Sequence, residues 1–152
     1  PICNMDLVVK GDDDDVNMEA ASLIKLSQGK QILANVKTVS LIKEKGINTF
    51  YAFQMRNEGF NHILIEKILG TLSKNVYITF DVDYFDPSIM PSTGTPEPNG
   101  FYWDETMRLL KRVCAEKNLV GFDVVELAPQ KDYTFPDFLT AKLIYKILNY
   151  KF

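Results

Sequence analysis

The sequence predicts an α/β fold in which a mainly parallel sheet is covered by helices in a three-layer arrangement. Two observations support this prediction. Runs rich in strand-forming residues alternate with segments of helical periodicity, and acidic residues stand where two of the strand runs end. With 152 residues, 46% of them hydrophobic, the chain can bury one core, and we expect a single domain over residues 1–152.

The first third of the chain carries two helical patterns and one strand pattern. Residues 16–29 place apolar residues at helical spacing and end at Gly29, a residue type common just after helices. Residues 34–45 repeat this pattern before Gly46. Residues 47–53 are rich in β-formers. We therefore predict two helices followed by a strand.

The remainder of the chain continues the alternation of strand and helix. The predicted elements are a helix over 61–72, a strand over 75–80, a helix over 104–117 with Asp104 as its N-cap, a strand over 119–126, and a C-terminal helix with Pro136 in its first turn. Along this last helix, apolar residues recur at helical spacing at Phe138, Ala141, Ile144, Tyr145 and Leu148.

Charge and composition exclude several classes of protein. A net charge of −3 and a pI near 5.2 provide no basic stripe, so we expect neither nucleic acid nor an anionic membrane as a partner. The charge suits a small cationic substrate. Cys3 and Cys114 are far apart and there is one histidine, which indicates neither a disulfide scaffold nor a zinc finger. No apolar segment has membrane-spanning length, and we expect a reducing, cytoplasmic setting.

Two conspicuous features favour ordinary structural interpretations. The four consecutive acids at 12–15 lack the ordered ligand spacing of a calcium loop, and such runs are usually solvated turns. His62 has no second histidine or cysteine at ligand spacing, so we expect a surface histidine rather than a metal ligand.

The strongest chemical signal lies at the end of the strand predicted over 75–80. Alternation along a strand places Asp81 and Asp83 on the same side where the strand stops. Glu126 ends the next predicted strand, and parallel strands bring their carboxyl ends to one rim. Carboxylates this close repel each other unless a cation or a shared proton relieves them. The pattern predicts a metal site.

A stiff, irregular loop follows the two aspartates. Prolines and glycines recur between residues 91 and 100, a density that restricts the loop's conformations. Ordered loops at sheet ends tend to be functional, and Thr95 is one of the polar residues that this loop could present to a ligand. Packing of the loop itself is the alternative role for Thr95.

Three segments of this chain resemble the ureohydrolases, the family of arginases, agmatinases and formimidoylglutamases. The first is Thr79-Phe-Asp-Val-Asp-Tyr-Phe-Asp-Pro87, which is similar to the family's Ser-x-Asp-x-Asp-x-x-Asp-Pro. The second is Pro91-Ser-Thr-Gly-Thr-Pro-Glu-Pro-Asn-Gly100, and the third is Gly121-Phe-Asp-Val-Val-Glu-Leu-Ala-Pro129. The resemblance covers about residues 76–152 and is greatest to agmatinases. It implies an arginase-like fold.

The resemblance also implies roles for individual residues. Asp81 would bridge two Mn²⁺ ions, Asp83 would bind one of them, and Glu126 would face the guanidinium group of the substrate, with Thr95 as a further substrate-binding candidate. The implied reaction is hydrolysis of a guanidino group, such as agmatine to putrescine and urea. A carboxylate suits the fork of donors on a guanidinium, and paired metals lower the pKa of water. Asp86, which precedes a proline, is expected to cap a turn instead.

The chain departs from the family pattern in its first half. The family takes its other metal ligands from a Gly-Gly-Asp-His-Ser turn and an Asp-Ala-His-x-Asp strand end, and this sequence has neither. We therefore expect a segment to be missing near residues 30–33, and a chain that is inactive by itself. Apolar faces left open in this way would need a partner chain, so we expect a homo-oligomer.

Two other functions remain open at this point. A degenerate, non-catalytic ureohydrolase remnant could act as a binding or regulatory subunit, which the absent histidines would favour. A small phosphate-handling domain with Mg²⁺ at its strand-end aspartates is the second alternative, although the sequence has no Gly-rich phosphate turn.

Overall fold

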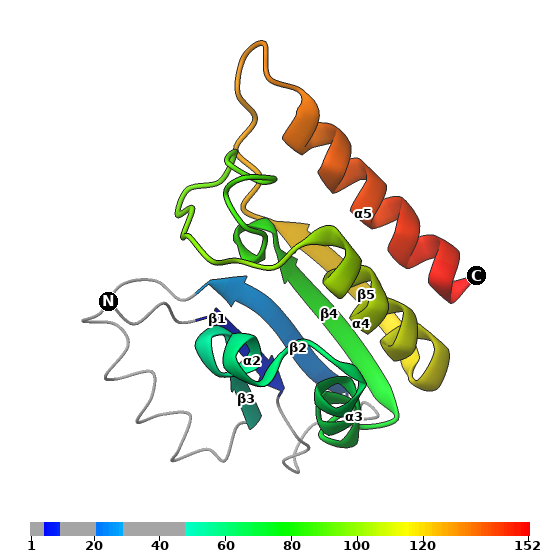
Figure 1. The fold of residues 1–152 in the computed structure, drawn as a ribbon. Helices are drawn as coiled ribbons and strands as arrows, with labels where there is room; N and C mark the ends of the chain where they lie inside the picture. Colours follow the sequence, from blue (N-terminus) through cyan, green and yellow to red (C-terminus); the bar gives the residue numbers. More distant parts are fainter. Residues whose placement is uncertain (1–4, 10–20, 29–47) are drawn as a thin grey trace.

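A computed structural model describes residues 5–9, 21–28 and 48–152 of the chain (Figure 1). These residues form one five-stranded sheet in the order β3-β1-β2-β4-β5. The strands are β1 (Met5–Val9), β2 (Ala21–Gln28), β3 (Asn48–Tyr51), β4 (Asn75–Asp81) and β5 (Asn118–Val125). Strand β4 runs parallel to both β2 and β5, whereas β1 pairs antiparallel with β2 and β3. The predicted α/β class is confirmed. The described sheet is mixed rather than mainly parallel, because two of its four strand pairs are antiparallel, and the acidic residues follow the parallel strands β4 and β5.

The helix predicted over residues 16–29 is wrong over Ala21–Gln28, which form strand β2. The apolar residues of this short stretch fit either periodicity, and its eight residues are few for an independent helix. Pairing with β1 on one side and β4 on the other supplies backbone hydrogen bonds that outweigh local propensity. The helix predicted over 34–45, the missing segment predicted near 30–33 and the acids at 12–15 lie outside the described residues.

The strand predicted over 47–53 is confirmed in part. Strand β3 ends at Tyr51, and helix α2 (Ala52–Glu58) begins at once, with Ala52 and Met55 buried. The helix predicted over 61–72 is α3 (His62–Gly70). Its N-cap is Asn61, whose side-chain oxygen accepts hydrogen bonds from the backbone N–H groups of residues 63 and 64 at 3.0 and 3.1 Å. His62 is exposed in its first turn, as the surface interpretation predicted.

The core lies against one face of β4. Val76, Ile78 and Phe80 alternate along this strand and are fully buried, whereas Tyr77 and Thr79 between them are only partly buried. In the view of Figure 1, α2, α3 and α4 (Trp103–Glu116) lie in front of the sheet. Helices α3 and α4 contribute to the same buried cluster through residues such as Ile68 and Leu110. The buried face fixes the register of β4 and therefore the place where it ends.

The prediction that Asp104 is the N-cap of α4 is wrong. The cap is Tyr102, whose backbone N–H donates a 3.0 Å hydrogen bond to Oε2 of Glu105, a residue of the first turn. Asp104 instead lies inside the first turn, where its carboxylate is 3.6 Å from Arg108. The Glu105 carboxylate thereby accepts from the backbone N–H of the cap residue, a donor that has no partner within the helix.

Helix α5 (Phe135–Lys151) begins with Pro136 in its first turn, as predicted. Its buried side is formed by Leu139, Thr140, Leu143 and Ile147. The apolar residues noted at helical spacing lie mainly on the other side, where Phe138 and Tyr145 are 67% and 59% exposed. The helix is therefore apolar on both sides, which is why its periodicity did not identify the packed face. None of the described helices is long and apolar enough to cross a membrane.

Candidate metal and substrate site

Asp81 and Asp83 stand together where β4 ends. Asp81 is the last residue of the strand, and Asp83 lies in a short 3-10 helix, η1 (Val82–Tyr84), rather than in a continued strand. Oδ1 of Asp81 accepts a 3.1 Å hydrogen bond from the backbone N–H of Asp83. Both residues are buried, at 6% and 2% exposure. We expected strand alternation to bring Asp81 and Asp83 together, but the 3-10 turn η1 does so instead.

The electrostatics of this pair favour a bound positive charge. Burial, followed by the negative charge of Asp83, raises the pKa of Asp81 from its ordinary 3.8 to about 7. The charge of Glu126 acts in the same direction. A buried carboxyl group whose ionised form is disfavoured by neighbouring carboxylates takes up a proton or holds a cation.

Thr95 approaches the pair from the proline-rich loop. Its hydroxyl donates a hydrogen bond to Oδ2 of Asp83 at 3.0 Å. The loop is anchored nearby by a backbone hydrogen bond from Ala128 N–H to the carbonyl of Ser92 at 2.9 Å, and by a bridge between Thr93 and Leu127. The loop therefore packs against the segment that follows β5.

Glu126 lies in that segment, one residue beyond the end of β5. It is exposed, and its backbone has φ of 66°, a left-handed conformation that a glutamate rarely adopts. A Cβ placed on Gly94 of the loop would be 3.7 Å from Oε2 of Glu126, so the carboxylate points towards the loop. Strained backbone of this kind is concentrated at functional sites. The structure thus brings the four candidate residues, Asp81, Asp83, Thr95 and Glu126, to one rim of the sheet.

Asp86 caps a turn, as predicted, and does not join this group. Its Oδ1 accepts hydrogen bonds from the N–H and hydroxyl of Ser88 at 3.0 and 2.6 Å, and its Oδ2 accepts from the N–H of Asn99 at 3.0 Å. Burial alone would raise the pKa of Asp86, but these hydrogen bonds lower it below its ordinary value. Asp86 therefore joins the two ends of the loop.

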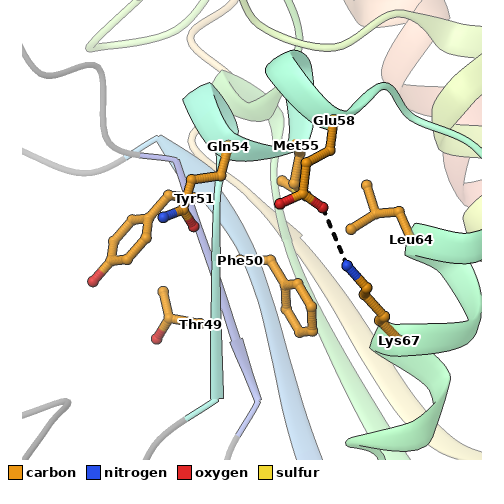
Figure 2. A pocket seen from close by; sticks show the side chains of 8 residues that line it. All are labelled: Thr49, Phe50, Tyr51, Gln54, Met55, Glu58, Leu64 and Lys67. Atoms are coloured by element: carbon orange, nitrogen blue, oxygen red, sulfur yellow. Dashed lines mark hydrogen bonds and ion pairs between the residues drawn. The ribbon is translucent and has the colours of Figure 1, made fainter.

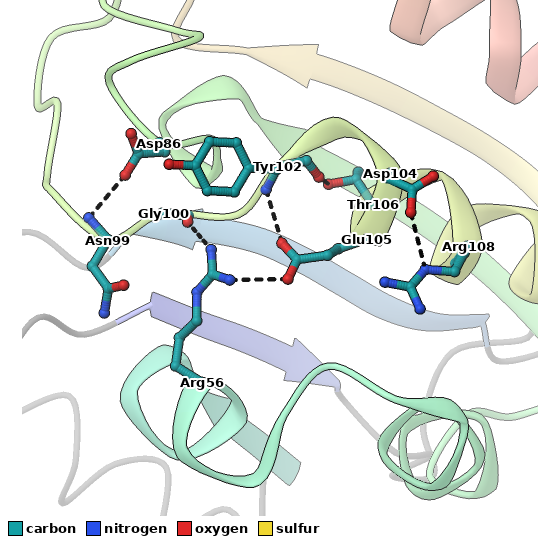
Figure 3. A network of polar contacts seen from close by, with 9 residues as sticks. All are labelled: Arg56, Asp86, Asn99, Gly100, Tyr102, Asp104, Glu105, Thr106 and Arg108. Atoms are coloured by element: carbon teal, nitrogen blue, oxygen red, sulfur yellow. Dashed lines mark hydrogen bonds and ion pairs between the residues drawn. The ribbon is translucent and has the colours of Figure 1, made fainter.

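Sequence reasoning missed two polar groups that support the site. Arg56 of α2 reaches the end of the loop and the start of α4 (Figure 3). Behind the rim, Tyr77 and Thr79 of β4 donate to Oδ2 of Asp123 on β5 at 3.0 and 3.3 Å, and the bond to Asp123 is the main cause that raises the pKa of Tyr77. The pairing of Thr79 with Asp123 could have been anticipated by aligning the two strands. No local pattern marks Arg56, because its partners are more than forty residues away.

The residues present fit part of a divalent metal site. Two buried carboxylates are suitable ligands for a hard cation such as Mn²⁺. Within the described ranges, however, no group of three or more His, Cys, Asp or Glu side chains could hold a metal ion. Asp81 and Asp83 are the two ligands that the described residues would supply.

A hollow of about 210 Å³ lies away from this rim, between β3, α2 and α3 (Figure 2). Its lining consists of Thr49, Phe50, Tyr51, Gln54, Met55, Glu58, Leu64 and Lys67. Across it, Lys67 forms a 3.3 Å ion pair with Glu58. It is smaller than usual ligand pockets of about 300–1,000 Å³, and none of the four candidate residues lines it.

Comparison with known proteins places the chain in a family. Residues 29–149 match the model of the Arginase family. The N(1)-aminopropylagmatine ureohydrolase of a Synechocystis species is 39% identical over 110 residues, which cover 72% of this chain and 35% of that protein. The agmatinase of Salmonella paratyphi B is 39% identical over 92 residues, covering 59% of this chain and 29% of the relative.

Solved structures agree with these sequence relatives. The agmatine ureohydrolase of Thermoplasma volcanium superimposes with a TM-score of 0.58 at 34% identity, covering 66% of this chain and 33% of that structure. The chain thus spans about a third of the length of the relatives it matches. Since the family model spans most of the sequence, including the rim residues and the loop between them, the chain belongs to the Arginase family of ureohydrolases.

Proposed function

We propose that this chain carries active-site residues of an agmatinase-like ureohydrolase. The reaction would hydrolyse a guanidino group, converting agmatine to putrescine and urea. The observation that carries the proposal is the convergence of Asp81 and Asp83, the Thr95 loop and Glu126 at one rim. A ureohydrolase site needs negative charge for metal ions and a further carboxylate for the cationic substrate, and this rim offers both.

Asp81 and Asp83 would hold Mn²⁺ through their carboxylates. When bound, the ions would lower the pKa of water and supply hydroxide as the nucleophile near neutral pH. The contribution of this chain is to hold both carboxylates in a buried, fixed geometry. Thr95 supports it by occupying one oxygen of Asp83, which restricts the directions from which that carboxylate can bind an ion.

Glu126 would bind the guanidinium group. Its carboxylate is exposed at the rim and lies beside the loop, so a substrate can reach it from solvent. A guanidinium presents paired N–H donors that match two carboxylate oxygens, which orients the carbon to be attacked. Agmatine is the substrate we favour because named relatives act on agmatine or aminopropylagmatine, and because the acidic chain suits a cation. The cytoplasmic setting belongs to this proposal, and the homo-oligomer and the single domain remain predictions.

The experiment measures urea release and bound Mn²⁺ in two preparations, the protein purified from its source and the 152-residue chain alone. We expect the former to release urea from agmatine and the latter to be inactive, since its sequence has neither of the two histidine-containing motifs that supply the family's other metal ligands. Asp81→Asn should abolish both Mn²⁺ binding and urea release in the active preparation. Asp104→Asn, at an exposed helix position, is the matched control and should change neither.

Two results would contradict the proposal. Full Mn²⁺ content and turnover in Asp81→Asn would remove Asp81 from the site. Mn²⁺ binding without urea release from agmatine, arginine or aminopropylagmatine would instead identify a non-catalytic member of the family.

A further inference from the structure

Arg56 contacts a carboxylate, a backbone carbonyl and an aromatic ring, while its buried Nε has no hydrogen-bond partner among the described residues. Nη1 donates to Oε1 of Glu105 at 2.9 Å, and Nη2 donates to the carbonyl of Gly100 (Figure 3). The guanidinium carbon also lies over the Phe101 ring, 4.4 Å from its centroid, and 5.7 Å from that of Tyr102. One side chain from α2 therefore holds the end of the proline-rich loop and the first turn of α4 together.

The segment that Arg56 holds is tied to the residues that follow Asp83. The N–H of Phe101 donates to the carbonyl of Tyr84, and the N–H of Asp86 donates to the carbonyl of Phe101, both at 3.0 Å. Gly100 allows this approach, since a Cβ there would lie 2.5 Å from the backbone nitrogen of Asp86. The two ends of the loop are thereby fastened side by side, and Thr95 lies between them in sequence.

We propose that Arg56 is a positioning residue that keeps this loop closed over Asp83 and Glu126. The kinetic part of the inference rests on the proposed function, and the structural part does not. Only an arginine can bind a carboxylate and a carbonyl through separate nitrogens while its plane covers an aromatic ring. Loss of these contacts would leave the returning end of the loop held by Asp86 and the backbone bonds of Phe101 alone, and would loosen the hold of the loop on Thr95 beside Asp83.

The test compares Arg56→Met and Arg56→Lys with Arg108→Met, which loses a charge in an exposed ion pair of α4. Hydrogen exchange is measured at the backbone amides of Asp86, Asn99 and Phe101, with the amides of α3 as the internal reference. We expect exchange at the three loop amides to quicken about tenfold in Arg56→Met, less in Arg56→Lys, and not at all in Arg108→Met. Glu105→Gln, which weakens the same clamp from the other side, provides a second variant if Arg56→Met does not fold.

Kinetics in a preparation that releases urea provide the second readout. We expect Arg56→Met to raise the KM for agmatine about tenfold while kcat changes less than about twofold, because the loop borders the guanidinium carboxylate. Unchanged loop exchange, or equal quickening throughout α3, would overturn the proposal, as would quickened loop exchange with an unchanged KM. If no preparation releases urea, the proposed function fails, and loop exchange alone decides whether Arg56 holds the loop.

Discussion

The hydroxyl of Thr95 lies 3.0 Å from Oδ2 of Asp83, although twelve positions separate the two residues. This hydrogen bond connects the proline-rich loop directly to the carboxylate pair. It gives Thr95 a role in orienting Asp83 whether or not Thr95 also touches a substrate, so the two interpretations left open by the sequence are compatible.

Thr95→Val should weaken the site with little effect on packing, because valine has nearly the same shape but no hydroxyl. We expect the free energy of unfolding to fall by about 1.5–3 kcal/mol, the usual value of a hydrogen bond to a charged group, and Mn²⁺ to bind more weakly in a loaded preparation. Thermal unfolding and metal titration measure the two effects. Thr95→Ser retains the hydroxyl and serves as the control; a serine variant as impaired as the valine variant would contradict this role.

Gly100→Ala should be among the more damaging small substitutions in the chain. The added Cβ would lie 2.5 Å from the nitrogen and 2.7 Å from the Cα of Asp86, and these are backbone atoms, which cannot adjust as a flexible side chain would. We expect a loss of about 2–4 kcal/mol in chemical denaturation, comparable to overpacking in a rigid core.

Gly70 provides the matched control for this substitution. It is the last residue of α3, and no atom lies within 4 Å of a Cβ built there. Gly70→Ala should therefore be neutral or stabilise the chain by up to about 1 kcal/mol. Equal effects of the two alanine substitutions would show that residues 84–86 do not restrict the loop.

Glu126 should show opposite effects on stability and on function. Glycine adopts φ of 66° without strain, so Glu126→Gly is expected to leave the free energy of unfolding unchanged or raise it by about 1 kcal/mol. Both Glu126→Gly and Glu126→Gln should greatly reduce urea release, since neither retains the carboxylate. Denaturation measures the effect of relieving the backbone strain, and urea assays measure the effect of losing the carboxylate. A glycine variant that is strongly destabilised would rule out backbone strain at this position.

The sequence predicted the second half of the fold more accurately than the first, for a physical reason. Buried residues alternate along β4, and α3 and α4 carry caps or apolar stripes that are local in sequence. β2 depends on pairing with β1 and β4, which no local pattern reveals, so it was assigned as a helix. The sequence pattern also did not identify which side of α5 packs against the core, because both sides of that helix are apolar.

The same distinction applies to the site. Asp81, Asp83 and Glu126 follow strands, so their meeting at one rim follows from parallel topology once the strands are recognised. The contact from Thr95 to Asp83 and the reach of Arg56 from α2 are set by the path of an irregular loop. Neither has a periodic signal in the sequence, because both are contacts between segments that are distant along the chain.

The stability of the metal-free chain should fall as the pH rises from about 4 to about 7. Burial and the neighbouring charge of Asp83 raise the pKa of Asp81 to about 7 in the folded chain, against 3.8 ordinarily. Between these values the folded state binds a proton that the unfolded state has lost, so each rise in pH disfavours folding. The penalty is absent below about pH 4 and complete above about pH 7. A difference of about three in pKa corresponds to about 4 kcal/mol, and solvent screening at the partly buried rim reduces the expected penalty to about 2 kcal/mol.

Asp86 cannot produce this slope, because its lowered pKa has the opposite effect in a different window. Its contribution to stability is present above its ordinary pKa and is lost only as the pH falls further. Asp81→Asn should therefore flatten the profile between pH 4 and 7 and be more stable than the unaltered chain at pH 8, since the amide carries no charge and its oxygen can still accept from Asp83. Asp104→Asn, whose side chain is 91% exposed, should leave the slope intact. Denaturation at a series of pH values in the presence of a chelator measures these slopes, and an unaltered slope in Asp81→Asn would mean that another group takes up the proton.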